Sequence, residues 1–163
     1  MSEFELYLSL GSDTGDRMAY MESALKMLDE RFGCRFNALS SFIETEPWGF
    51  ESDKLFLNAV VMYKLQLRPG QNLQELGESI LDKCKDVERW LGRCDAPEYD
   101  SAGKRIYHSR TIDIDILFIG NACIDTCRLT VPHRLIKERD FVMIPLKEIV
   151  SGHIVEYFPD IFE

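Results

Sequence analysis

The chain has 163 residues, of which 45% are hydrophobic and 29% are charged, a balance typical of one globular domain with a buried core. Its formal net charge of -9 argues against general binding to nucleic acid or to anionic membranes, and we expect neither partner. No apolar run approaches the length of a membrane span, and the first residues lack the pattern of a signal peptide, so we expect neither feature.

The first half of the chain predicts a strand, a helix and two further strands. Apolar and polar residues alternate over 4–10, which predicts a half-buried strand. Apolar residues three or four apart over 18–32 predict an amphipathic helix that ends at Gly33. A less regular strand is predicted over 36–45. A long strand over 56–67 places one apolar side toward the core, formed by Leu57, Ala59, Val61, Tyr63, Leu65 and Leu67.

The second half predicts a helix, a long loop, a strand and a mixed C-terminal part. The helix covers 73–91, and the aperiodic segment 92–109 is long enough for a functional loop. The order β-α-β-β-α-β predicts a ferredoxin-like α+β sandwich, an antiparallel sheet with helices on its faces. After the strand that ends at Phe118, a small hairpin and helix at the C-terminal side are predicted near 122–124, 129–131 and 141–150.

The segment from Ser109 to Phe118 carries two aspartates on one face of its predicted strand. Because residues two apart point to the same side, Asp113 and Asp115 share a face, while Ile112, Ile114, Ile116 and Phe118 share the other. Two neighbouring carboxylates repel each other, so a positive group should lie against them. We expect one or two Mg²⁺ ions there, because Mg²⁺ binds few carboxylates and completes its shell with water and phosphate. The alternative is an amphipathic strand with a solvated acidic face.

Basic residues lie on both sides of the long loop and within it. Arg93 and Arg110 bracket the loop, and His133 follows a predicted strand. Arginine offers a permanent charge and bidentate phosphate geometry, so these residues form a candidate phosphate-binding set. The alternatives are surface arginines, a structural histidine and a solvated loop. The loop itself contributes Lys104, Arg105 and His108.

A second candidate set could bind a flat heterocycle. Asn58 lies on a strand whose opposite face is apolar, so its amide could read the edge of a ring. Trp48, Phe56 and Phe141 could stack on such a ring, or they could belong to an ordinary apolar cluster. The sequence contains no P-loop, GxGxxG or GxSxG motif, which excludes nucleotide and hydrolase sites of those types.

Taken together, these segments resemble 6-hydroxymethyl-7,8-dihydropterin pyrophosphokinases. The resemblance extends from about Leu6 to Val150. It is most specific in the combination of an R-T-x-D-x-D block with L-T-V-P-H. The matching segments are Leu8-Ser-Leu-Gly-Ser, Thr45-x-Pro-x-Gly, Phe56-Leu-Asn-Ala-Val, Glu88-Arg, Gly92-Arg93, Arg110-Thr-Ile-Asp-Ile-Asp-Ile-Leu and Leu129-Thr-Val-Pro-His.

The resemblance implies a single pyrophosphokinase domain over 1–163, with 152–163 as a C-terminal tail. It also implies transfer of a diphosphate from ATP to the pterin hydroxymethyl group in folate biosynthesis, with release of AMP. Asp113 and Asp115 would hold two Mg²⁺ ions, and Arg93 and Arg110 would stabilise the transferring phosphates. The nucleotide would be bound by His133, Ile116, Leu129, Thr130 and Glu88, and the pterin by Thr45, Trp48, Phe56, Asn58 and Phe141.

The chain departs from the family pattern at three places. Phe56 stands where many members have tyrosine, which keeps the stacking face and removes a hydroxyl. Trp48 fills a position that is often aliphatic, and His108 one that is often glycine. The roles of Lys104 and Arg105 cannot be assigned from the resemblance.

Two other functions remain compatible with the residues alone. A non-catalytic binding module on the same scaffold would bind ligand without Mg²⁺ and release no AMP, because a fold does not fix a function. A different two-metal phosphotransferase would act on another hydroxyl. The five cysteines show no zinc-site spacing and favour a reducing compartment, so we expect a cytoplasmic location. We also expect a monomer that acts on small molecules.

Overall fold

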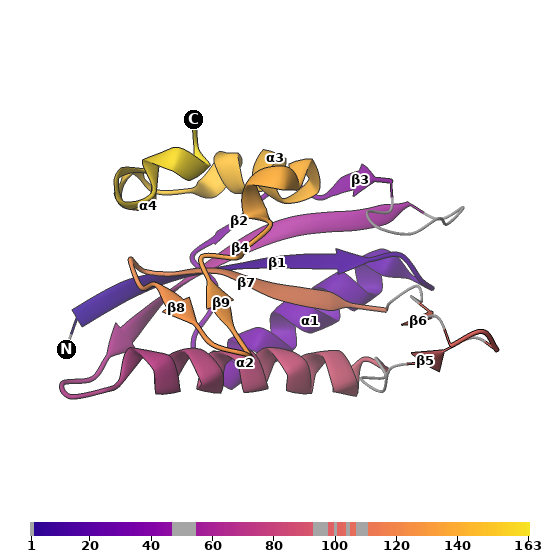
Figure 1. The fold of residues 1–163 in the computed structure, drawn as a ribbon, viewed down its shortest axis with the longest axis horizontal. Coiled ribbons are helices and arrows are strands. Elements are labelled where there is room, and N and C mark those ends of the chain that lie inside the picture. Colours follow the sequence, from indigo (N-terminus) through magenta and orange to yellow (C-terminus); the bar gives the residue numbers. More distant parts are fainter. Residues whose placement is uncertain (1, 47–54, 93–97, 100, 104, 107–110) are drawn as a thin grey trace.

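An antiparallel five-stranded sheet forms the centre of the fold, with helices on both of its faces (Figure 1). The computed structural model describes residues 2–46, 55–92, 98–99, 101–103, 105–106 and 111–163. The strand order is β2-β4-β1-β7, and β3 pairs with another part of β4. The strands are β1 (Ser2–Ser12), β2 (Ala38–Leu39), β3 (Ile43–Thr45), β4 (Phe56–Leu67) and β7 (Asp113–Ile119).

Helices α1 (Arg17–Phe32) and α2 (Leu73–Trp90) cover one face of the sheet. Both begin at a side-chain cap, since Asp16 accepts a hydrogen bond from the Ala19 N–H and Asn72 accepts from two amides of its first turn. Gly33 ends α1 in the left-handed conformation that glycine adopts at little cost. The buried side of α2 carries Ile80, Cys84 and Val87, as the 3.6-residue periodicity predicted.

A second helical layer covers the opposite face of the sheet. It consists of α3 (Asp140–Ile149) and α4 (Gly152–Tyr157), with short 3₁₀ turns η1 (Ile136–Glu138) and η2 (Pro159–Ile161). The predicted C-terminal tail is therefore ordered and packed. The sequence prediction assigned one apolar side to β4. In the structure, Val60 and Met62 are buried on its other side as well.

The prediction for Phe118 was wrong. It was expected to share a face with Ile112, Ile114 and Ile116, but it packs with Tyr7 in the second core. The register between β1 and β7 shifts at Tyr7/Leu8, so that two residues of β7 lie opposite Tyr7. This bulge reverses the alternation beyond Ile116 and turns Phe118 toward the C-terminal helices.

Smaller strands differ from their predicted bounds. The strand expected over 36–45 is interrupted between β2 and β3, because Ser40 Oγ takes the place of a ladder acceptor and binds the Val60 N–H at 2.8 Å. The segment 92–109 was predicted as a loop, but its described part contains a short antiparallel ladder. That ladder joins β5 (Glu98–Tyr99) to β6 (Arg105–Ile106), and a second hairpin joins β8 (Ile124–Asp125) to β9 (Thr130–Val131).

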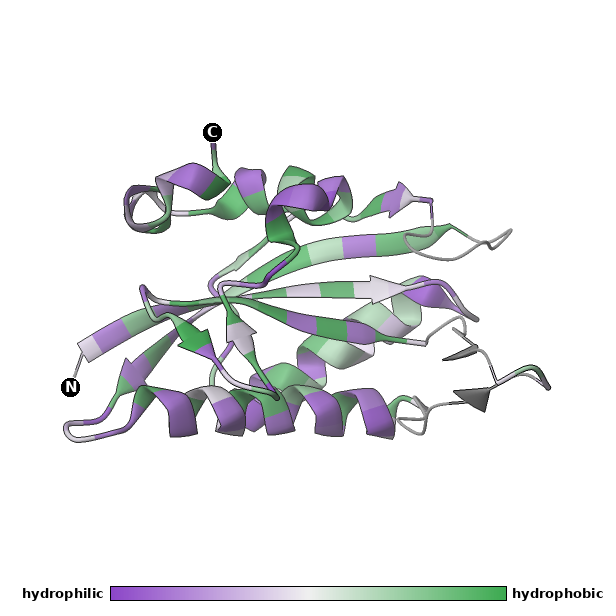
Figure 2. Cartoon of the chain, viewed as in Figure 1, coloured by the Kyte–Doolittle hydropathy of each residue, from purple (hydrophilic) through white to green (hydrophobic). Residues whose placement is uncertain are grey.

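Hydrophobic residues concentrate on the sheet and on the inward sides of the helices, while the outward side of α2 is hydrophilic (Figure 2). None of the helices in the described residues is both long enough and apolar enough to cross a membrane. The antiparallel sheet with helices on both faces confirms the predicted ferredoxin-like α+β class.

Candidate functional site

A pocket of about 420 Å³ lies along β7, between the C-terminal half of α2 and the segment that follows β9. It gathers side chains from elements that are far apart in the sequence. Its lining residues are Leu81, Lys85, Glu88, Asp113, Ile114, Asp115, Ile116, Arg128, Leu129, Thr130, His133, Arg134, Leu135 and Arg139.

The two predicted metal-binding aspartates lie together in this pocket. Asp113 and Asp115 are both partly exposed, and Ile114 between them is buried in the core below. The period-two prediction for this part of β7 is confirmed. A pair of carboxylates on one strand face, open to solvent, is a donor set that suits a hard divalent cation.

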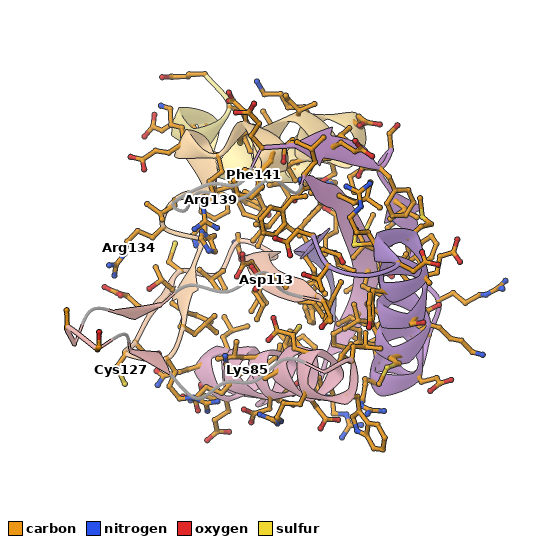
Figure 3. All side chains as sticks on the ribbon, turned by 90° about the vertical axis from the view of Figure 1, so that its right-hand side faces the viewer. Lys85, Asp113, Cys127, Arg134, Arg139 and Phe141 are labelled. Carbon is orange, nitrogen blue, oxygen red and sulfur yellow. The ribbon has the colours of Figure 1, made fainter. Side chains whose placement is uncertain are left out.

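Arg139 provides the positive charge that the sequence argument required. Its Nη1 lies 3.4 Å from Asp115 Oδ2, and the two side chains are 16% and 31% exposed. The guanidinium also lies over the Phe141 ring, 5.6 Å from its centroid. Figure 3 shows Arg139 between Asp113 and Phe141, and Lys85 on α2 on the other side of Asp113. Arg139 was not among the residues predicted from the sequence, because only the turn after η1 brings it to β7.

His133 lies in the pocket in its neutral form. Its backbone N–H donates to Leu117 O at 3.1 Å, and its Nδ1 accepts from the Leu135 N–H at 3.2 Å. Burial lowers the pKa of His133 to about 4; Arg139 lowers it further, and Asp113 acts in the opposite sense. Because Nδ1 is an acceptor, the single proton of the neutral ring is on Nε2, which makes His133 a hydrogen-bond donor.

Four other predicted nucleotide-site residues also line the pocket: Glu88, Ile116, Leu129 and Thr130. Glu88 Oε2 accepts a hydrogen bond from the Ile114 N–H at 2.9 Å. Leu129 and Thr130 come from the β8–β9 hairpin, which lies against α2. The structure thus brings the predicted nucleotide set together with the aspartates.

The predicted ring-binding set lies farther along the same sheet face. Asn58 is 4% exposed, and its Nδ2 donates to Thr45 Oγ1 at 2.6 Å. The register pairs Asp113 with Gly11, and Gly11 with Asn58. A Cβ on Gly11 would lie 3.0 Å from Asn58 Oδ1 and 3.6 Å from the Phe56 ring. The glycine therefore leaves space on the sheet surface between the aspartates and Asn58.

Several predicted site residues lie outside the described residues. These are Trp48, Arg93 and Arg110, together with Lys104 and His108 of the long segment and the side chain of Arg105. Their roles stay predictions, as does a ring held between Phe56 and Phe141.

The pocket also contains cationic side chains that the sequence analysis did not select. Lys85, Arg128 and Arg134 join Arg139 around the acidic floor. Arg128 pairs with Asp82 of α2 at 2.6 Å, which links the hairpin to the helix beside the pocket. A basic rim over two aspartates can bind a polyphosphate together with a divalent cation. In the sequence, Lys85 lies four residues from both Leu81 and Arg89, which places the three on one side of α2. This spacing alone does not distinguish a pocket lysine from an ordinary surface lysine.

Comparisons with known proteins point the same way. Residues 7–151 match the family model described as 7,8-dihydro-6-hydroxymethylpterin-pyrophosphokinase. A 2-amino-4-hydroxy-6-hydroxymethyldihydropteridine pyrophosphokinase of Porphyromonas gingivalis is 42% identical over 145 residues, covering 88% of this chain and 89% of that protein. The protein of the same name from Bacillus subtilis is 34% identical over 143 residues, covering 88% and 76%.

One relative carries this region as part of a longer chain. The folate synthesis bifunctional protein, mitochondrial, of Pisum sativum is 34% identical over 150 residues, which are 92% of this chain and 26% of that protein. The family match spans the sheet, the pocket and both helical layers up to Ser151. This chain therefore belongs to the 7,8-dihydro-6-hydroxymethylpterin-pyrophosphokinase family.

Proposed function

We propose that this chain transfers a diphosphate from ATP to the hydroxymethyl group of 6-hydroxymethyl-7,8-dihydropterin in folate biosynthesis. The observation that carries the proposal is the pocket along β7, which Asp113 and Asp115 line together with Lys85, Arg128 and Arg139. An acidic floor with a basic rim is the arrangement that a metal polyphosphate requires.

Asp113 and Asp115 would hold Mg²⁺, two ions in the full complex. Their fit to Mg²⁺ rests on the donor set, which is two partly exposed carboxylates on one strand face. In the described residues, no group of three or more histidine, cysteine or acidic side chains is arranged to hold a metal. Bound Mg²⁺ would neutralise charge on the phosphate oxygens.

The cationic side chains would orient the triphosphate. Arg128 and Arg139 supply permanent positive charge, Lys85 adds an ammonium group, and neutral His133 supplies an N–H donor that does not depend on pH near neutrality. Arg93 and Arg110 remain proposed catalytic residues, by family resemblance. Phosphoryl-type transfer asks a protein mainly for positioning and charge stabilisation, which this set would provide.

The two ends of the site would bind the two rings. Ile116, Leu129 and Thr130 would form the adenine end, supported by their place at the hairpin side of the pocket. The pterin end would comprise Thr45, Trp48, Phe56, Asn58 and Phe141. The Thr45–Asn58 hydrogen bond fixes the Asn58 amide, so its remaining polar groups could read a pterin edge.

The proposed reaction balances as one displacement at phosphorus. The substrate hydroxyl oxygen forms a bond to the β-phosphorus of ATP while the bond from that phosphorus to the α-phosphate oxygen breaks. AMP leaves, and the hydroxyl proton passes to Asp115 or to water. Holding the hydroxyl and the β-phosphorus in line over the sheet surface at Gly11 is the contribution that we assign to the protein.

Replacing Asp115 by alanine tests this assignment. The variant removes one carboxylate of the metal pair, so AMP formation from ATP, Mg²⁺ and hydroxymethyldihydropterin should fall at least a hundredfold. AMP is measured by chromatography, and thermal melting verifies folding. Asp160→Ala, at an exposed acid of the C-terminal segment, is the matched control and should retain activity. Near-normal turnover of Asp115→Ala would overturn the metal assignment.

Domain organisation, oligomeric state, location and partners are also part of the proposal. The chain would act as a single-domain monomer in the cytoplasm, and it would bind small molecules and no nucleic acid. Free Cys34, Cys84, Cys123 and Cys127 support a reducing compartment. Sedimentation of the purified chain at micromolar concentration measures the oligomeric state.

A further inference from the structure

We propose that Glu88 is the positioning residue for the aspartate pair, acting through its hydrogen bond to the backbone between the two carboxylates. The inference rests on the proposed function of Asp113 and Asp115 as metal ligands. Glu88 was expected to contact the nucleotide, but its Oε2 accepts from the Ile114 N–H at 2.9 Å. It is 1% exposed, so this carboxylate is held inside the protein.

The position of β7 explains why such a contact is needed. Within the described sheet, β7 is an end strand that pairs with β1 on one side. The Ile114 N–H points to the other side, where a strand partner would otherwise bind it. A buried backbone N–H without an acceptor costs free energy, and Ile114 is 5% exposed, so this N–H needs an acceptor from another element. Glu88 replaces the missing strand at this residue.

The hydrogen bond acts directly on the metal ligands. The Ile114 N–H belongs to the peptide group that joins Asp113 to Ile114, so holding it sets the direction of the Asp113 main chain. The next peptide leads to Asp115. Functional geometry requires such support, because ligands displaced by even about 1 Å lose much of their effect.

The helix that carries Glu88 is itself fixed. Cys84, one turn earlier on α2, is fully buried in the core that also contains Val87 and Ile114. Burial raises the pKa of the Cys84 thiol, and the negative charges of Glu88 and Asp115 raise it further. The shared core and the Glu88 hydrogen bond therefore connect α2 directly to the aspartate strand.

Two substitutions separate the hydrogen bond from the charge. Glu88→Gln keeps the length of the side chain and an acceptor oxygen but removes the charge. Glu88→Asp keeps the charge but shortens the side chain by about 1.5 Å, so the acceptor no longer reaches the Ile114 N–H. Glu75→Gln, an exposed acid on the same helix, is the matched control for a lost negative charge.

The readout is metal binding and not turnover alone. Mn²⁺ binding is followed by electron paramagnetic resonance in the presence of α,β-methylene-ATP, an analogue that cannot be cleaved at the bond broken in the reaction. We expect Glu88→Asp to weaken Mn²⁺ binding at least tenfold and to lower kcat at saturating Mg²⁺ by a similar factor. Glu88→Gln and Glu75→Gln should stay within threefold of the wild type, and the KM for the pterin should not change.

Every other pattern overturns the proposal. If Glu88→Gln is impaired and Glu88→Asp is not, the charge matters and the hydrogen bond does not. If both bind Mn²⁺ normally and only melt earlier, Glu88 is merely structural, and if both are impaired equally, reach is not the determinant. A wild-type protein that binds no Mn²⁺ with the nucleotide would instead refute the proposed metal function itself.

Discussion

Asp115 and His133 show how single side chains of the pocket take their chemistry from tertiary neighbours. Arg139 lies 3.4 Å from Asp115 and offsets its negative charge. His133 is kept neutral by burial and by the positive charge of the same arginine. Metal entry would therefore change the environment of Arg139 and, through it, that of the histidine.

The lowered pKa of His133 predicts acid sensitivity of the folded state. The folded protein keeps this ring neutral down to about pH 4, whereas the unfolded chain binds a proton below its ordinary value of 6.5. The unfolded state then binds more protons, so stability is lost as the pH falls from 6.5 towards 4 and the loss is complete below that range. The contribution between pH 7 and pH 5 is about 1 kcal/mol once partial exposure is allowed for.

His133→Asn tests this prediction, because the asparagine oxygen can still accept from the Leu135 N–H while the titrating ring is removed. Urea unfolding without nucleotide or metal should show a smaller difference in stability between pH 7 and pH 5 than in the wild type. His153→Asn, at the exposed start of α4, is the control. An unchanged pH difference in His133→Asn would contradict the assignment.

At the scale of elements, the β8–β9 hairpin is fitted against α2 through Gly77. A Cβ at Gly77 would lie 2.9 Å from both Ile124 Cδ1 and Leu129 Cδ2, closer than side chains normally approach. A glycine inside a helix costs about 1 kcal/mol relative to alanine. The close packing of the hairpin, which carries Leu129 and Thr130 to the pocket, explains its presence here.

Gly77→Ala should therefore disturb the nucleotide end of the pocket. Overpacking typically costs about 1–3 kcal/mol and exceeds the gain of about 1 kcal/mol in helix propensity, so the net loss of stability should be up to about 2 kcal/mol. The hairpin should move away from α2 and raise the KM for ATP about threefold, with the KM for the pterin unchanged. Steady-state kinetics and urea unfolding measure both effects.

Gly152→Ala is the control for this substitution, since a Cβ there meets no atom within 4 Å. It should leave the KM for ATP unchanged, and it should change the free energy of unfolding by less than about 0.5 kcal/mol. A Gly77→Ala protein that is more stable than the wild type, with an unchanged KM for ATP, would contradict the argument that the hairpin leaves no room for a side chain at this position.

Sequence patterns were sufficient for the long elements and insufficient for the short ones. The alternation in β1 and β4 and the helical stripes of α1 and α2 are local features, and the structure confirms them. No local sequence pattern predicts the ladder of β5 and β6 or the break at Ser40, because both depend on partners elsewhere in the chain. Phe118 was misplaced for the same reason, because the bulge arises from pairing with β1.

At the scale of the whole molecule, the C-terminal segment completes the second core. The ring of Phe158 lies 5.4 Å from that of Phe118, and Phe162 stacks at 6.1 Å. Phe118 is itself fully buried. These contacts hold α4 and η2 on the sheet face that also carries the aspartates, on the side away from α1 and α2.

Phe158→Ala should destabilise the protein without altering the chemistry of the pocket. A fully buried phenylalanine contributes about 3–5 kcal/mol relative to alanine, and the partial burial of Phe158 reduces this to about 2 kcal/mol. The melting temperature should fall by about 4–8 °C, with kcat at 25 °C within about twofold of the wild type. Tyr157→Ala, at a residue 53% exposed, is the control, and an equal fall there would contradict the packing argument.

The sequence by itself determined the fold class, the long helices and strands, and the shared face of Asp113 and Asp115, because period-two and 3.6-residue patterns are properties of the local backbone. It also carried the motifs of the family. Tertiary structure alone decided that Arg139 pairs with Asp115, that Glu88 holds the Ile114 N–H, and that the bulge in β7 turns Phe118 to the second core. Those features are contacts between segments that are far apart in the sequence, and such contacts depend on how the whole chain packs.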